Sequence, residues 1–185
     1  YSSTSECEGD CVEQANMVYS GIIGHPSLLV WDPSNQHISG SRIVEHFNEN
    51  NISGYDYLST NEVPVIDNYN TVFIFLGVYP ENRVLSENEV QSFIDLLNSG
   101  GNLYMEGGDT WAFDASTSLH SMFGLSPESD GSADLSTING VDGAFAEGLS
   151  FSYNGGNSYV DRLLPSGGFS ILKNNSPEYF TAIGY

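Results

Sequence analysis

Carboxylate side chains that could act as an acid, a base or a cation ligand lie at the ends of two predicted strands. Asp32 ends the apolar run Leu28–Asp32, and Glu106 ends the run Asn102–Glu106, with Asp109 shortly after it. Ligands of open parallel sheets bind outside the carboxyl ends of the strands, so these three acids are candidate catalytic residues. Together they could form an acid–base pair or chelate Ca²⁺ or Mg²⁺. The alternative is that Asp32 and Asp109 cap the turns that follow them.

Two tryptophans accompany these acids and suggest contact with carbohydrate. Trp31 directly precedes the first acid, and Trp111 follows the last, with Tyr104 and Phe113 nearby in the sequence. Exposed aromatic rings beside carboxylates are a usual combination in sugar-binding sites, so Trp31, Trp111 and Asp109 are candidate ligand-binding residues. Aromatic side chains also fill hydrophobic cores, and that use is the commoner one.

A further acidic segment, residues 128–134, reads Glu-Ser-Asp-Gly-Ser-Ala-Asp. Asp130 and Asp134 could ligate calcium through oxygen. The segment lacks the D-x-D-x-D-G spacing and the terminal Glu of an EF-hand loop, so a solvated loop is the stronger interpretation. Calcium is the one cofactor that the sequence leaves as a candidate.

The two cysteines lie close together near the start of the chain. Cys7 and Cys11 could form a small disulfide if Gly9 permits a tight turn. Metal ligation would need two more soft or imidazole ligands, and His25 is the one nearby. The sequence contains no G-x-S-x-G elbow, no phosphate-binding G-x-x-x-x-G-K loop and no H-E-x-x-H helix.

The charge balance excludes some classes of partner. The 185-residue chain has 24 acidic residues against 4 Lys and Arg, which gives a formal net charge of −20. Four cations cannot neutralise a polyphosphate, and an acidic surface repels anionic lipid, so nucleic acid and membrane surfaces are poor partners. The longest apolar run, residues 71–77, is far shorter than the ~20 residues of a membrane-spanning helix.

Composition favours an extracytoplasmic location. The chain has a single Lys, is rich in Ser, Asn and Gly, and begins at Tyr1 rather than Met. Two closely spaced cysteines suit an oxidising compartment. We therefore expect a secreted or cell-surface protein whose natural ends lie outside this sequence.

Short apolar runs alternate with helical patterns in the part of the chain before Leu125. The predicted strands are Leu28–Asp32, Tyr55–Leu58, Val72–Leu76 and Asn102–Glu106, and the predicted helices are Gly40–Asn51, Glu87–Ser99 and Ser116–Phe123. The helix Glu87–Ser99 carries an S-x-x-E capping box at its start and Gly100-Gly101 at its end. This alternation predicts an α/β fold with a mainly parallel sheet and helices on both faces.

The C-terminal third has a different texture, rich in Ser, Gly and Asp. Its apolar stretches predict antiparallel strands added to one edge of the sheet, and they are Phe145–Tyr153, Tyr159–Leu164, Phe169–Leu172 and Tyr179–Tyr185. Residues 1–27 lack clear periodicity and are predicted to be an N-terminal extension. The α/β domain is therefore expected to cover residues 28–185.

The segment Thr71–Asp109 resembles a known superfamily. Its order is apolar strand, loop, capped helix, Ser99-Gly-Gly, strand and the turn Glu106-Gly-Gly. This order looks like the class I glutamine amidotransferase-like superfamily, within it the trehalose-utilisation-like branch that lacks amidotransferase activity. The resemblance covers Leu28–Tyr185. It implies a flavodoxin-like sheet whose last strand and helix lie beyond Tyr185, in a module of a secreted or surface bacterial protein.

The resemblance also implies where a nucleophile would lie, which is the sharp turn after the fourth strand. Catalytic members carry a Cys flanked by glycines there, and a His-Glu pair much later in the chain. Here the turn reads Tyr104-Met-Glu-Gly-Gly-Asp109, and no histidine follows His120. Thiol amidotransfer therefore has no nucleophile.

These observations favour a non-catalytic recognition or assembly module, a pseudoenzyme, whose partner is another extracellular protein or a carbohydrate. One alternative is a carboxylate-dependent hydrolase of a carbohydrate-like substrate, with Glu106 and Asp109 or Asp32 as acid and base. Another is a structural subunit of an extracellular assembly, in which the N-terminal segment or the incomplete C-terminal strand pairs with a neighbouring chain, which could be a second copy.

Overall fold

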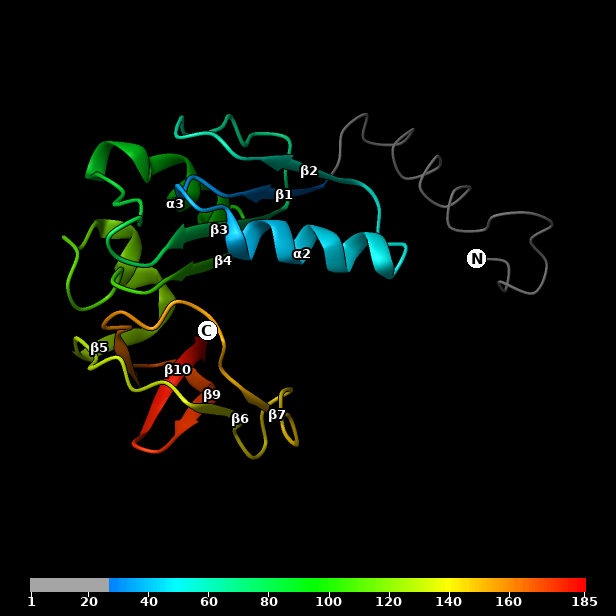
Figure 1. Cartoon of the computed structure of the whole chain (residues 1–185). Coiled ribbons are helices and arrows are strands. Elements are labelled where there is room, and N and C mark those ends of the chain that lie inside the picture. The colour runs from blue at the N-terminus through cyan, green and yellow to red at the C-terminus, as the bar shows by residue number, and fades with distance from the viewer. Residues whose placement is uncertain (1–26) are drawn as a thin grey trace.

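The computed structural model describes residues 27–185, which form two separate β-sheets (Figure 1). One sheet has four parallel strands in the order β2-β1-β3-β4. The other has six antiparallel strands in the order β5-β8-β10-β9-β6-β7. The predicted α/β class is confirmed. The predicted disulfide between Cys7 and Cys11 lies outside the described residues.

The parallel strands coincide with the four predicted apolar runs. They are β1 (Leu28–Trp31), β2 (Tyr55–Leu58), β3 (Thr71–Gly77) and β4 (Asn102–Gly107). β1 lies between β2 and β3, in register with both along its whole length. Strands in this position are covered on both sides, which explains why β1 and β3 read as nearly continuous apolar sequence.

The helices lie close to their predicted ranges, with one difference. α2 spans Ile38–Glu49. The predicted helix Glu87–Ser99 begins instead as the 3-10 helix η2 (Glu87–Glu89) and continues as α3 (Gln91–Asn98), a common arrangement in the first turn of a helix. A further 3-10 helix, η3, spans Ser118–Phe123. No helix within the described part of the chain is long and apolar enough to cross a membrane.

Successive side chains of β1 belong to different hydrophobic clusters. Leu29 and Trp31 pack with Phe93 of α3, while Val30 packs with Phe47 of α2. All three β1 residues are completely buried. Complete burial of three large apolar side chains is worth several kcal/mol relative to exposure, so β1 is the centre of the core.

The C-terminal strands form a sheet of their own, so the prediction that they extend one edge of the parallel sheet is wrong. They are β5 (Leu125–Ser129), β6 (Thr137–Gly140), β7 (Ser150–Ser152), β8 (Arg162–Pro165), β9 (Phe169–Asn175) and β10 (Glu178–Gly184). β5 and β6 were not predicted because they contain few apolar residues. Both strands are defined by their pairing with β8 and β9, which come much later in the chain.

Asp161 connects the two sheets at the turn that follows β4. Its N–H donates to the carbonyl oxygen of Gly108 at 2.7 Å. Its Oδ2 accepts the N–H groups of Trp111 and Ala112 at 2.7 and 2.8 Å. The residue is 3% exposed, and its Oδ1 has no hydrogen-bond partner among the described residues. One carboxylate thus ties the start of β8 to the end of the parallel sheet.

Because Asp161 is buried, its carboxyl group should make the free energy of unfolding depend on pH. Burial raises the pKa of Asp161 to about 6, with a further rise from Asp109 and Asp130, although the N–H groups of Ala112 and Trp111 lower it. The unfolded value is ~3.9, so the folded state binds the proton more tightly than the unfolded state does. The contribution of Asp161 to the free energy of unfolding should therefore rise, by up to about 2 kcal/mol, as the pH falls from about 7 to about 4.

Urea unfolding across this pH range checks the expectation. Other acids of this highly charged chain also titrate there, so the comparison is with Asp161→Asn, which keeps an oxygen that can accept the N–H of Trp111. The free energy of unfolding of the variant should change less steeply between about pH 7 and pH 5. Parallel curves for the two proteins would show that Asp161 titrates normally.

Candidate functional site

Asp32, the first predicted catalytic acid, is fully buried directly after β1. Its Oδ1 accepts the N–H and the Oγ–H of Ser34 at 3.2 and 2.6 Å. Its Oδ2 accepts the N–H of Gly40 at 3.0 Å, in the first turn of α2. Asp32 therefore caps the turn that follows it, as the alternative interpretation of this residue held. It also accepts an N–H group in the first turn of α2, and it exposes no oxygen to a substrate.

The cap requires glycine at position 40. A Cβ at Gly40 would lie 2.3 Å from Oδ2 and 2.6 Å from Cβ of Asp32. Because Asp32 is completely buried, its carboxylate has no open space into which it could move. The close approach of this helix to its capping acid thus depends on the absence of a side chain.

Gly40→Ala should lower the free energy of unfolding by about 1–3 kcal/mol, the usual cost of overpacking. Helix propensity alone predicts the opposite sign, a gain of up to about 1 kcal/mol. Urea unfolding of the variant distinguishes the two, with Ser41→Ala as the control at the next position. A stabilised Gly40→Ala variant would contradict the capping role of Asp32.

The bend that follows Met105 is a closed turn. The N–H of Gly108 donates to the carbonyl oxygen of Gly77 at the end of β3, at 2.9 Å. A Cβ at Gly107 would lie 2.0 Å from Oγ1 of Thr110, which is itself buried. The polypeptide therefore folds back on itself too tightly to admit a side chain at Gly107.

Asp109 is buried in this bend, and its Oδ2 accepts the N–H of Tyr79 at 2.9 Å. Its backbone carbonyl accepts the N–H of Asp114 at 2.8 Å. Burial raises the pKa of Asp109, and nearby Asp130 raises it too, while the N–H of Tyr79 lowers it. The residue thus holds together the loops that follow β3 and β4.

Of the three predicted catalytic acids, Glu106 is the one that bonds to a hydroxyl group of a distant element. Its Oε1 accepts the hydroxyl of Ser39 in α2 at 2.5 Å, and its Oε2 accepts the phenol of Tyr104 at 2.8 Å. A carboxylate alone is a weak base toward a serine hydroxyl, and no described histidine is hydrogen-bonded to Ser39 or Glu106. The structure brings Glu106 to Ser39, but Asp32 and Asp109 each have separate partners.

The tryptophans do not form an exposed rim: Trp31 and Trp111 fill the core, the commoner of the two uses that the sequence leaves open. Trp31 is completely buried, stacks on Phe93 with ring centroids 5.7 Å apart, and donates its Nε1–H to the carbonyl of Thr60 at 2.9 Å. Trp111 is 7% exposed and lies edge-on to Phe123 at 5.1 Å. Both rings fill the core, because that removes the largest apolar area from water.

The candidate calcium ligands, Asp130 and Asp134, are not gathered around a common site. Asp134 accepts the guanidinium of Arg162 at 2.7 Å and the phenol of Tyr179 at 2.8 Å. Asp130 is exposed to solvent in the loop that follows β5. Among residues 27–185, no group of three or more His, Cys, Asp or Glu side chains is arranged to hold a metal ion.

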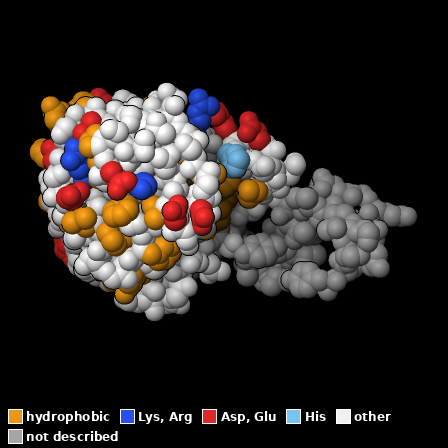
Figure 2. Space-filling model, turned by 90° about the horizontal axis from the view of Figure 1, so that it is seen from below, with side chains coloured by type: hydrophobic (Ala, Val, Ile, Leu, Met, Phe, Trp, Pro, Cys, Tyr) orange, Lys and Arg blue, Asp and Glu red, His pale blue; other side chains and the backbone are white. Residues whose placement is uncertain are grey.

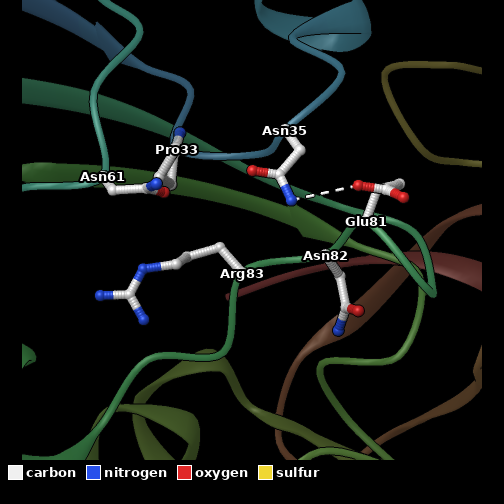
Figure 3. Close-up of a pocket in the computed structure, with 6 residues that line it drawn as sticks. All are labelled: Pro33, Asn35, Asn61, Glu81, Asn82 and Arg83. Carbon is white, nitrogen blue, oxygen red and sulfur yellow. Dashed lines mark hydrogen bonds between the residues drawn. The ribbon is translucent and has the colours of Figure 1, made fainter.

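A polar pocket lies at the carboxyl ends of β1, β2 and β3 (Figure 3). Its volume is about 360 Å³, and its lining residues are Pro33, Asn35, Asn61, Glu81, Asn82 and Arg83. From β1 the chain first adds β2 on one side, and it then crosses back to add β3 on the other side of β1. The switch point of the sheet therefore lies between β1 and β3. Ligands of doubly wound α/β proteins bind at this place.

The pocket offers amides more than free charge. In Figure 3, Asn35 and Glu81 face one another, and the amide of Asn35 donates to Oε2 of Glu81 at 3.1 Å. Arg83 bonds to the carboxylate of Glu89 and to the carbonyl of Val84. The guanidinium is therefore already neutralised by the protein itself.

The same pairing holds for every cation of the chain. The four ion pairs of Lys and Arg are Arg42–Glu45, Arg83–Glu89, Arg162–Asp134 and Lys173–Glu178. On the face seen in Figure 2, Lys and Arg side chains lie beside acidic ones. With a net charge of −20 and no cation left over, the protein offers no attraction to an anionic ligand.

The sequence contained a partial signal for the pocket. The rule that ligands bind beyond the carboxyl ends of strands also points to the loop after β3, whereas the predicted catalytic acids lie at or just after the ends of β1 and β4. Asn35, Asn61 and Asn82 were overlooked, because Asn is common in loops and carries no spacing pattern. Only the strand order brings these amides, from loops far apart in the sequence, to one pocket.

Comparison of the chain with protein-family models, with curated proteins and with solved structures gives no significant match.

Proposed function

We propose that this protein is a non-catalytic recognition module that binds a polar ligand in the pocket at the switch point of its parallel sheet. The observation that carries the proposal is the closed bend after Met105. The buried carboxylates of Asp32 and Asp109 are occupied by backbone N–H groups, while the neighbouring pocket presents amides. Side chains arranged in this way can hold a ligand in place but supply no nucleophile or acid–base pair.

The proposal includes the amidotransferase-like scaffold, with helices on both faces of the parallel sheet. The strand order β2-β1-β3-β4 supports it, because this is the start of the flavodoxin-like order. The separate packing of α2 and α3 against alternate residues of β1 supports the helix arrangement. On this view the glycine-rich bend is the former nucleophile turn, and Glu106 lies in it without a thiol.

We also propose a secreted or cell-surface location, where such a module would meet an extracellular protein or a carbohydrate. The low content of basic residues and the Ser/Asn/Gly-rich composition support it. For the ligand itself, the pairing of all four cations favours an uncharged or a cationic compound over an anion.

A ligand screen tests the recognition function. Thermal-shift and ligand-observed NMR screens with neutral and cationic polar compounds should yield a hit, and the protein should show no turnover of amides, esters or glycosides. Asn61→Ala should weaken the hit about tenfold, which corresponds to the loss of about one good hydrogen bond. Asn68→Ala is the matched control, because Asn68 is an exposed Asn of the same loop that does not line the pocket.

A hydrolase remains the second candidate because of one observation, the short hydrogen bond between Ser39 and Glu106. If this pair were catalytic, purified protein would hydrolyse an ester, amide or glycoside, and Glu106→Gln would abolish the rate. We expect no such activity, since no histidine assists the pair. A reproducible rate that is lost in Glu106→Gln but kept in Asn61→Ala would replace the recognition function.

An assembly role is the third candidate, and one feature of β4 supports it. β4 pairs with β3 alone among the described strands, so its outer edge carries unpaired backbone groups. An exposed edge is a template for a strand from another chain. A mass measurement in solution addresses it, since a stable monomer over a wide range of concentrations would count against this role.

A further inference from the structure

Two aromatic side chains are exposed beside the switch-point pocket. Tyr79 follows β3 and is 53% exposed, and Phe113 follows β4 and is 62% exposed. Their ring centroids lie 6.5 Å apart with an angle of 70° between the ring planes. Because β3 and β4 are neighbouring parallel strands, both loops belong to the same edge of the sheet as the pocket.

The backbone on either side of these rings is tied down by buried acids. Asp109 accepts the N–H of Tyr79 with its side chain and the N–H of Asp114 with its carbonyl. Asp161 accepts the N–H of Ala112, directly before Phe113. The two rings are thus held in position without a ligand, which lowers the entropic cost of binding one.

Asn82 joins the aromatic pair to the pocket. It lines the pocket, and its amide donates to Oδ2 of Asp114 at 2.9 Å, in the residue directly after Phe113. The loop that carries Phe113 is therefore bonded directly to a residue of the pocket, so the rings and the amides are neighbours at this edge of the sheet.

We propose that Tyr79 and Phe113 form an aromatic platform which, together with the pocket amides of Asn35, Asn61 and Asn82, binds a neutral oligosaccharide. The inference rests on the proposed recognition function and names its ligand class. A sugar ring is itself amphipathic: its C–H face stacks on an aromatic ring, and its hydroxyls donate and accept hydrogen bonds as an amide does. The pocket volume of about 360 Å³ lies within the range of small-ligand sites.

The three acids that hold the platform loops are not available to a cationic peptide. Asp109, Asp114 and Asp161 are occupied by internal hydrogen bonds to Tyr79, Asn82 and the backbone of Trp111 and Ala112. Burial is the main cause that raises the pKa of each of these three carboxyls. They are therefore poor partners for an incoming ammonium group. The amides of Asn35 and Asn82 also donate internally, to Glu81 and Asp114, so these two residues offer a hydroxyl group chiefly their carbonyl oxygens, while Asn61 offers both a donor and an acceptor.

Titration with oligosaccharides tests the inference. The probes are neutral hexasaccharides of glucose, xylose and mannose, with hexagalacturonate as the anionic probe and hexalysine as the cationic one, each followed by NMR on the full chain. At least one neutral hexasaccharide should bind, with little dependence on salt. Phe113→Ala and Tyr79→Ala should each weaken it at least about tenfold.

Phe145→Ala is the matched control, because Phe145 is 84% exposed and its loop joins β6 to β7 in the other sheet. It should leave binding unchanged. Both platform residues are largely exposed, so their variants should fold, which unfolding curves verify.

Four outcomes would overturn the inference: no neutral hexasaccharide binds at millimolar concentration, hexagalacturonate binds better, hexalysine binds in a salt-sensitive manner, or Phe113→Ala binds the sugar normally. Failure of the inference and failure of the proposed function can be told apart. If the hit from the ligand screen is weakened by Asn61→Ala but not by Phe113→Ala, the recognition pocket stands and the aromatic platform is refuted. If Asn61→Ala also has no effect on any bound compound, the recognition pocket is refuted as well.

Discussion

Buried carboxylates that accept backbone N–H groups are the interaction on which the rest of this structure depends. Asp32 caps α2, Asp109 connects the loops after β3 and β4, and Asp161 connects those loops to the second sheet. Burying a charge is costly unless it is hydrogen-bonded, so each acid requires the loop conformation that supplies its donors. The carboxyl edge of the parallel sheet is in this way specified by acids that never reach the surface.

The same hydrogen bonds also make these carboxylates structural groups. A carboxylate that is already bonded to N–H groups is a poor acid, base or cation ligand, because each new partner must replace a bond that the fold needs. What remains available at this edge is a set of amides and two exposed aromatic rings. The acids fix the backbone beside Tyr79 and Phe113, and the proposed recognition function rests on the groups that these acids leave available.

Charge decides which ligands can approach. The protein carries a net charge of −20, yet each of its four cations is paired with an acid of its own. Pairs at a protein surface add little stability, but they neutralise the groups that would otherwise attract anions. The surface is therefore unfavourable to anions. In the proposed site, selectivity among other ligands would depend on shape, amides and aromatic faces.

By itself, the sequence determined the four parallel strands and the approximate limits of α2 and α3, because apolar periodicity and caps are local properties. It also determined that an edge of the sheet would gather acids. Only the tertiary structure decided that Trp31 and Trp111 are core residues, that β5 and β6 are strands, and that three loop asparagines meet in one pocket. Burial and pairing depend on partners far away in the chain, and no local pattern encodes which side of a loop faces water.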